Sequence, residues 1–168
     1  GYTVNPVIIS PERKKLLNRN LMLFFTGFSR FSSDIQVAAE KNLKSTQNQL
    51  LELLSLVDDA EKILTSKTDL EEFGRLLDYT WQLKRGITDK VSTDSIDAVY
   101  SRALQAGATG GKLLGAGGGG FLLFYVDPDK QENVRKALEN LLYVPFEFEN
   151  GGTRVIHYTP ESYEPVNA

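Results

Sequence analysis

Apolar positions along the chain change their spacing several times, and each spacing predicts one type of element. Residues 21–26 form a continuous apolar run closed by Gly27, which is typical of a strand covered on both faces. Over residues 32–64 the apolar positions recur three and four apart, as on one face of a helix. This stretch predicts one long helix, or two joined end to end with a bend near Ser45 and Thr46.

Two further helices are marked by their ends as well as by their apolar faces. Thr68 and Glu71 have the spacing of a capping box, so a helix is expected to begin there and to end near residues 84–86. Residues 95–106 predict the next helix, and Gly107 is placed as the residue that ends it. The side chains expected to point inward from this helix are Ile96, Val99, Tyr100 and Ala103.

The last third of the chain predicts a helix and a hairpin. Asp127 and Pro128 carry the signals of a helix N-terminus. The buried positions expected in this helix are Val134, Ala137, Leu138 and Leu141. Apolar and acidic residues alternate over residues 144–149, and an Asn-Gly turn at 150–151 precedes residues 155–158, which predicts an antiparallel hairpin. The expected fold is therefore α+β, with about four core strands in an antiparallel sheet and helices packed mainly on one face.

The glycine distribution points to a functional loop. Residues 107–120 contain eight of the chain's 14 glycines and lead directly into an apolar strand over residues 121–126. Glycine is favoured where the backbone takes positive φ or passes close to another group. Four consecutive glycines exceed what a two-residue hairpin requires, which favours a loop near a ligand's phosphates. The alternative is a hairpin that merely tolerates close packing.

Two common phosphate-binding motifs do not account for this loop. A P-loop needs four residues between its first glycine and Gly-Lys, then Ser or Thr, whereas Gly107 stands too close and Leu113 follows Lys112. The dinucleotide pattern matches within residues 115–120, but a strand-like run follows it where a helix should begin. The preceding helix also ends here, and the carbonyls of a helix C-terminus repel phosphate.

Several segments of the chain resemble one known family. Residues 110–123, GGKLLGAGGGGFLL, resemble the third conserved motif of the GHMP kinases, the superfamily of galactokinase, homoserine, mevalonate and phosphomevalonate kinases. Residues 23–30, LFFTGFSR, resemble the strand and turn that open the C-terminal domain in the sugar-kinase branch, especially the D-glycero-D-manno-heptose 7-phosphate kinases. Residues 81–85 and 96–100 follow in the order of that branch. The similarity covers residues 20–158 of the chain.

The resemblance implies the C-terminal, ferredoxin-like half of an ATP-dependent kinase that phosphorylates the anomeric hydroxyl of a sugar phosphate. ATP and Mg²⁺ are then expected to bind mainly to an N-terminal domain, whose phosphate loop and acidic residue are not among these 168 residues. Residues 1–19 are expected to be the end of that domain or a linker, residues 20–160 the C-terminal domain, and residues 161–168 a polar tail. No catalytic residue or metal ligand is expected in this chain, which should be inactive alone.

The resemblance also nominates site residues. The substrate-binding candidates are Thr26, Gly27, Ser29, Arg30 and Lys84, and the candidates near the phosphates are Lys112, Gly115, Ala116, Gly117, Gly118, Gly119 and Gly120. An arginine after a buried strand can bind phosphate through two hydrogen bonds, although a solvated arginine is the ordinary alternative. Lys112 is equally well explained as a solvated lysine. Trp81 is expected to pack in the core, and His157 is assigned no role.

Composition narrows the remaining alternatives. The net charge of −3 gives no electrostatic footprint for nucleic acid or an anionic membrane. The absence of cysteine excludes disulfides and thiol catalysis, and we expect a cytoplasmic protein without a membrane span. The expected partners are its own N-terminal domain and a small sugar phosphate, and a homodimer is left open. The alternatives are a fucose or galactose kinase of the same superfamily and a non-catalytic module that binds a small ligand or oligomerises.

Overall fold

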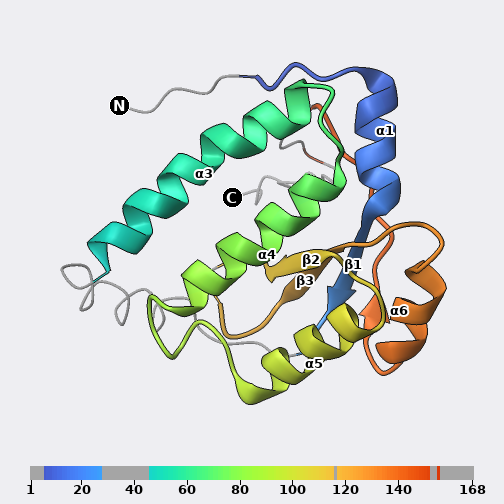
Figure 1. Cartoon of the computed structure of the whole chain (residues 1–168). Coiled ribbons are helices and arrows are strands. Elements are labelled where there is room, and N and C mark those ends of the chain that lie inside the picture. The colour runs from blue at the N-terminus through green and yellow to red at the C-terminus, as the bar shows by residue number, and fades with distance from the viewer. Residues whose placement is uncertain (1–5, 28–45, 116, 152–154, 156–168) are drawn as a thin grey trace, which may run out of the picture.

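The computed structural model describes residues 6–27, 46–115, 117–151 and 155. Their elements, in chain order, are α1 (Pro11–Asn20), β1 (Leu21–Phe25), α3 (Gln47–Thr65), α4 (Glu71–Arg85), α5 (Asp94–Gln105), β2 (Gly110–Leu113), β3 (Phe121–Tyr125), α6 (Gln131–Ala137) and β4 (Leu142–Tyr143). Figure 1 shows the helices arranged around a small central sheet. The predicted α+β class is therefore confirmed.

The four strands form one antiparallel sheet in the order β2-β3-β1-β4. In its register Phe25 of β1 faces Phe121 of β3, and Leu113 of β2 faces Leu122 of β3. The ends of β1 and β2 therefore meet the beginning of β3 at the same end of the sheet. The glycine-rich segment, which joins β2 to β3, lies at that end.

The alternation of side chains along the strands divides the core into two clusters. Met22, Phe24 and Phe124 belong to the larger cluster, together with residues of α4, α5 and α6. Leu21 and Tyr125, whose side chains alternate with these, belong to the smaller cluster with residues of α1 and α4. The inward residues predicted for α5, which are Ile96, Val99, Tyr100 and Ala103, are all buried. Helix α4 contributes to both clusters and so fixes the edge of the sheet.

Helix α1 was not predicted, because its sequence is mostly polar. Ser10 accepts a hydrogen bond from the backbone N–H of Arg13 at 3.2 Å, and Pro11 occupies the first turn, as at many helix N-termini. The Arg13 guanidinium also donates to the carbonyls of Leu64 at 2.8 Å and Thr68 at 2.6 Å. These contacts tie α1 to the C-terminus of α3, where carbonyls lack helical partners.

Two predicted helix starts are wrong by a few residues. Helix α4 has Leu70 as its N-cap, and the Asp69 carboxylate, not the Thr68 hydroxyl, accepts from the N–H of Glu71 at 2.9 Å. Helix α6 begins at Gln131, because the Asp127 carbonyl accepts from the N–H of Lys130 at 2.9 Å and closes a turn first. In both places a local turn replaces the expected cap.

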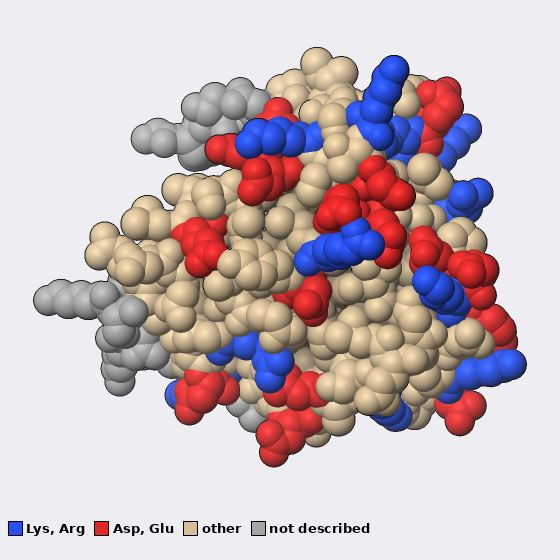
Figure 2. All heavy atoms as spheres, viewed as in Figure 1, with Lys and Arg blue, Asp and Glu red and all other residues tan. Residues whose placement is uncertain are grey.

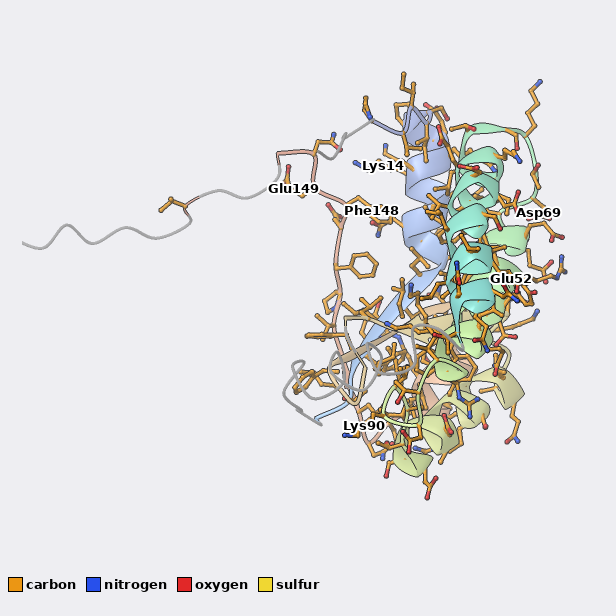
Figure 3. All side chains as sticks on the ribbon, turned by 90° about the vertical axis from the view of Figure 1, so that its left-hand side faces the viewer. Lys14, Glu52, Asp69, Lys90, Phe148 and Glu149 are labelled. Carbon is orange, nitrogen blue, oxygen red and sulfur yellow. The ribbon has the colours of Figure 1, made fainter. Side chains whose placement is uncertain are left out.

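The predicted strand over residues 144–149 is also wrong. Strand β4 comprises only two residues, and Pro145 has no N–H with which to continue a ladder. Beyond it, the side chain of Asn18 on α1 donates to the carbonyl of Phe146 at 3.1 Å and accepts from the N–H of Phe148 at 3.1 Å. Figure 3 shows Phe148 and Glu149 on this segment, close to α1. The expected partner strand, residues 155–158, lies outside the described residues except for Val155.

The surface carries charges of both signs. On the face drawn in Figure 2, acidic and basic side chains are interspersed, without a broad area of one sign. In the part of the chain that the structure describes, every helix is too short or too polar to cross a membrane.

Candidate functional site

The glycine loop, residues 114–120, is fastened to the end of β1 by one threonine. The buried Thr26 hydroxyl accepts from the N–H of Gly120 at 3.1 Å and lies 3.0 Å from its carbonyl. The N–H of Thr26 donates to the same carbonyl at 2.8 Å. On the other side, the N–H of Leu114 donates to the carbonyl of Phe121 at 2.8 Å. The loop is thus closed at its base by two strands that the sheet already holds in register.

The loop adopts a backbone that favours glycine at most of its described positions. Positive φ angles occur at Gly115 (81°), Gly117 (124°), Gly118 (72°), Gly119 (158°) and Gly120 (106°). Close packing adds a second requirement at Gly117, since a Cβ there would lie 2.8 Å from the carbonyl oxygen of the buried Val91. That same carbonyl accepts from the N–H of Gly118 at 2.9 Å. The backbone carbonyl of Val91 therefore holds the loop in place.

Helix α4 brings Lys84 to the loop. At one end of β2, Gly74 packs so closely on Gly110 that a Cβ on Gly110 would lie 2.1 Å from the Gly74 carbonyl oxygen. Lys84 follows Gly74 by ten helical residues, about 15 Å, and Gly115 follows Gly110 by five extended residues, about 16 Å. Helix α4 and the segment that begins at Gly110 therefore bring Lys84 and Gly115 to the same place. There Lys84 Nζ donates to the Gly115 carbonyl at 2.5 Å.

The electrostatic environment of Lys84 is unfavourable to its charge. Burial lowers the pKa of Lys84, and the nearby charge of Lys112 on β2 lowers this pKa further. Both side chains are half-buried, and among the described residues neither forms an ion pair with a carboxylate. By contrast, the neighbouring Arg85 pairs with Asp97 at 2.6 Å.

A polar network supports the beginning of β2. The Tyr100 hydroxyl donates to the Asp78 carboxylate at 2.6 Å and accepts from the N–H of Gly111 at 3.1 Å. Burial and the Asp78 carboxylate raise the pKa of Tyr100, so its hydroxyl stays protonated. The network joins α4, α5 and β2 at Gly111, the residue before Lys112.

The structure brings together several of the predicted site residues. Thr26 and Lys84 both contact the glycine loop. Gly27 follows Thr26 with φ of 73°, and a Cβ at this position would have no other atom within 4 Å. Ser29, Arg30 and Ala116 lie outside the described residues, as does His157. Trp81, expected in the core, is fully buried.

Other residues of this site were not predicted. Gly74 and Gly110 allow the close approach of α4 to β2. The carbonyl of Val91 holds the loop, and Val91 is an isolated apolar residue in a polar stretch of the sequence. Two signals were available: Gly110 belongs to the glycine-rich run, and Gly74 is a glycine within an otherwise regular helical pattern, which suggests close backbone packing. Within the described ranges there is no group of His, Asp and Glu side chains that could hold a metal ion. The site instead offers ammonium and backbone N–H groups, which suit the phosphates of a nucleotide or sugar phosphate.

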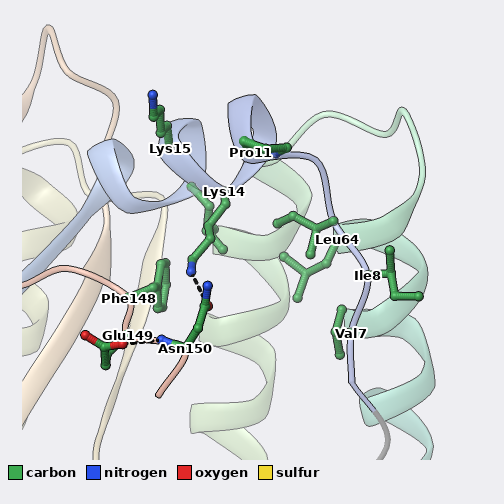
Figure 4. A pocket seen from close by; sticks show the side chains of 11 residues that line it. Val7, Ile8, Pro11, Lys14, Lys15, Leu64, Phe148, Glu149 and Asn150 are labelled. Carbon is green, nitrogen blue, oxygen red and sulfur yellow. Dashed lines mark hydrogen bonds between the residues drawn. The ribbon is translucent and has the colours of Figure 1, made fainter. Parts of the chain in front are cut away.

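A separate pocket of about 690 Å³ lies beside α1. It is lined by α1 and the segment before it, by Leu64 and by residues 148–150 (Figure 4). Of its two lysines, Lys14 and Lys15, Lys14 donates to the side-chain carbonyl of Asn150 at 2.6 Å. Its lining is mainly apolar, and it shares no residue with the glycine loop.

Comparison with known proteins identifies the family. The model of the family "GHMP kinases C terminal" matches residues 42–144. The D-glycero-alpha-D-manno-heptose 7-phosphate kinase of Campylobacter jejuni is 33% identical over 144 residues, covering 82% of this chain and 42% of that enzyme. The bifunctional fucokinase/GDP-fucose pyrophosphorylase of Arabidopsis thaliana is 26% identical over 140 residues, covering 81% of this chain and 13% of that protein.

A solved structure agrees with these sequence matches. A putative sugar kinase from Campylobacter jejuni is 30% identical, with a TM-score of 0.54 over 88% of this chain and 42% of that one. The chain thus spans about two fifths of the length of the heptose 7-phosphate kinase and of this sugar kinase. The sequence motif, the fold and all three comparisons agree: the chain belongs to the GHMP kinase family and corresponds to its C-terminal domain.

Proposed function

We propose that the protein containing this chain is an ATP-dependent kinase that transfers the γ-phosphoryl group of ATP to the anomeric hydroxyl of a sugar phosphate. The proposed acceptor is D-glycero-D-manno-heptose 7-phosphate. The observation that carries this proposal is the 33% identity to an enzyme of that name, which extends over 82% of the chain. Membership of the GHMP kinase family supports the kinase class.

The chain's proposed role is to position the reacting groups. Enzymes that transfer phosphoryl groups act mainly by aligning donor and acceptor and by stabilising negative charge. ATP supplies the phosphoryl group, Mg²⁺ neutralises part of its charge, and both are proposed to bind mainly to the remainder of the full-length protein. The glycine loop, Thr26 and Lys84 would then form the wall that faces the phosphates.

Arg30 is proposed to bind the phosphate that the acceptor already carries. It follows β1 by five residues, and β1 ends beside the glycine loop. A guanidinium group can donate two parallel hydrogen bonds to a phosphate. The 7-phosphate and the anomeric hydroxyl are at opposite ends of the sugar, so one residue can hold one end while the other end reacts.

A second candidate acceptor is L-fucose, which is favoured by the similarity to the Arabidopsis fucokinase. Fucose carries no phosphate, so Arg30 would have no anionic group to bind in that case. The charge of the acceptor therefore separates the two candidates.

The test is a kinase assay on the full-length gene product with ATP and Mg²⁺. ADP release is measured with heptose 7-phosphate, fucose, galactose and mevalonate. Preferred turnover of heptose 7-phosphate supports the proposal, whereas turnover of fucose or mevalonate alone would replace it. No turnover of any acceptor by a folded protein would favour a non-catalytic binding module.

The role of Arg30 is tested by Arg30→Ala. The variant should raise KM for the sugar phosphate by about tenfold or more, because it removes a hydrogen-bonded charge. The matched control is Arg102→Ala, which removes an exposed arginine from α5. An unchanged KM in Arg30→Ala would remove this residue from the acceptor site.

A further inference from the structure

Helix α3 carries apolar side chains that the rest of the described structure does not cover. Its sequence, QNQLLELLSLVDDAEKILT, places apolar residues on more than one side of the helix. None of its 19 residues, all of which the structure describes, is buried, whereas the shorter helices α4, α5 and α6 each bury at least one. A helix that is apolar on two sides normally has a packing partner on both. One side of α3 is therefore available for a further partner.

The uncovered side of α3 bears a ridge of three large apolar side chains. The opposite side packs on α4, and Figure 1 shows α3 at the left edge of the molecule, beyond α4. Leu51, Leu54 and Val57 are 56%, 67% and 60% exposed. Residues three apart are neighbours on a helix surface, so these side chains form one continuous feature, the α3 ridge. Exposed apolar patches of this kind mark surfaces that bind other proteins.

The polar residues around the α3 ridge are distributed unequally along the helix. The exposed carboxylates of Asp58, Asp59 and Glu61 all lie in its C-terminal half, where Lys62 is 3.3 Å from Asp59. The first turn has no acidic residue and begins with the exposed amide side chain of Gln47. The ridge thus has an amide at one end and carboxylates at the other.

Two such ridges are complementary when the helices run antiparallel. Gln47, Leu54 and Glu61 follow one another at intervals of seven residues, about two helical turns, so they lie nearly in line. With a two-fold axis at Leu54, Gln47 of one copy lies opposite Glu61 of the other, and Leu51 lies opposite Val57. The carboxylates also approach the N-terminus of the second α3, where the helix dipole favours negative charge. A parallel pair would instead bring the two acidic ends together.

We propose that the α3 ridge is a dimer interface, in which two copies of this chain pack their α3 helices antiparallel about a two-fold axis at Leu54. A second copy is the occupant because the pattern is self-complementary: each end of the ridge supplies the partner that the other end needs. The inference goes beyond the proposed kinase function and does not depend on it.

The first experiment measures molecular mass by sedimentation equilibrium, on the 168-residue chain and on the full-length gene product. Both should be dimers at micromolar concentration. Leu54→Lys should raise the Kd of the dimer by at least about a hundredfold, because the substitution occurs twice and would bury two like charges together. The matched control is Leu142→Lys on β4, where the leucine is 64% exposed and lies outside the ridge, and its Kd should be unchanged.

A second pair of variants tests the antiparallel orientation. Gln47→Lys would place a cation opposite Glu61 and should tighten the dimer by about twofold to tenfold, since the new ion pair occurs twice. Gln47→Glu should weaken the dimer by a similar factor. In a parallel pair residue 47 would face its own copy, so both substitutions would weaken it.

Cross-linking locates the axis directly. The chain contains no cysteine, so a single introduced cysteine reports one contact. Leu54→Cys should form a disulfide between two copies of the chain under mild oxidation, because the two side chains meet at the axis. Leu142→Cys should remain reduced under the same conditions.

Three results would overturn this interface. One is a monomeric original chain, and another is a folded Leu54→Lys variant that dimerises as tightly as Leu142→Lys. The third is a monomeric full-length protein in which Leu54→Cys is protected from a thiol reagent, which would assign the ridge to contacts with the remainder of the polypeptide. None of these measurements uses the kinase reaction, so failure of the interface and failure of the proposed function are distinguishable.

Discussion

The close contact between α4 and β2 predicts a large effect for one added methyl group. Gly110→Ala would place a Cβ 2.1 Å from the Gly74 carbonyl oxygen and 2.9 Å from the Cβ of Asp78. Such contacts are essentially never closer than 3.0 Å, so the helix and the strand must separate by about 1 Å. Overpacking of this kind costs about 1–3 kcal/mol. Gly110 does not have a positive φ, so the effect arises from the contact and not from backbone strain.

The same displacement should reach the candidate site. Lys84 is held at the loop by a contact of 2.5 Å to the Gly115 carbonyl, which about 1 Å of separation would stretch to the outer limit of a hydrogen bond. We therefore expect Gly110→Ala to lower the free energy of unfolding and to shift the amide resonances of the glycine loop.

The assay is urea unfolding of the chain, followed by Trp81 fluorescence. The matched control is Gly86→Ala, where φ is −71° and the nearest atom to the new Cβ is the flexible Gln49 side chain at 3.2 Å. The control should stay within about 0.5 kcal/mol of the original chain. If Gly110→Ala also stays within about 0.5 kcal/mol, α4 does not pack on β2 as described and the reasoning fails.

Three further predictions concern the supports of the loop. Tyr100→Phe should lower the free energy of unfolding by about 1–3 kcal/mol, because it leaves buried polar partners unsatisfied; an unchanged urea midpoint would contradict this. Thr26→Val should speed hydrogen exchange of the Gly120 N–H, which loses its acceptor, and unchanged exchange would show that this contact does not hold the loop. Since the folded-state pKa of Lys84 lies below the ordinary 10.5, the unfolded chain binds more protons between these two values, and stability should rise with pH across that window. Lys84→Met should abolish this rise in stability, and Lys112→Met should reduce it. The measurement is urea unfolding at several alkaline pH values, and a rise that persists in both variants would contradict the prediction.

The sequence predicted those elements whose buried apolar residues recur at a regular spacing. Helix α5 has one apolar face, and Ile96 and Tyr100 on that face are buried as expected. Helix α1 was missed because side-chain contacts to distant segments, such as those of Arg13 and Asn18, take the place of an apolar pattern. The strand over residues 144–149 was predicted from its alternation and from the Asn-Gly turn that follows it, and neither signal reveals whether a neighbouring strand is present.

The candidate site divides in a similar way. The glycine loop was evident from composition, because a run of glycine is unusual wherever it occurs. The contact of Lys84 with Gly115 joins residues 31 positions apart and depends on the packing of α4 along β2. The hydrogen bond from Gly118 to Val91 likewise depends on a backbone carbonyl, which every residue possesses. Neither contact leaves a signature in the sequence.

The full-length protein is proposed to phosphorylate the anomeric position of a sugar phosphate. The most direct measurement is ³¹P NMR of the purified full-length gene product with ATP, Mg²⁺ and D-glycero-D-manno-heptose 7-phosphate. We predict a new phosphate resonance coupled to the anomeric proton, which appears in step with ADP while the 7-phosphate resonance persists. ADP formation without a new sugar phosphate, or no reaction by the folded protein, would contradict the account.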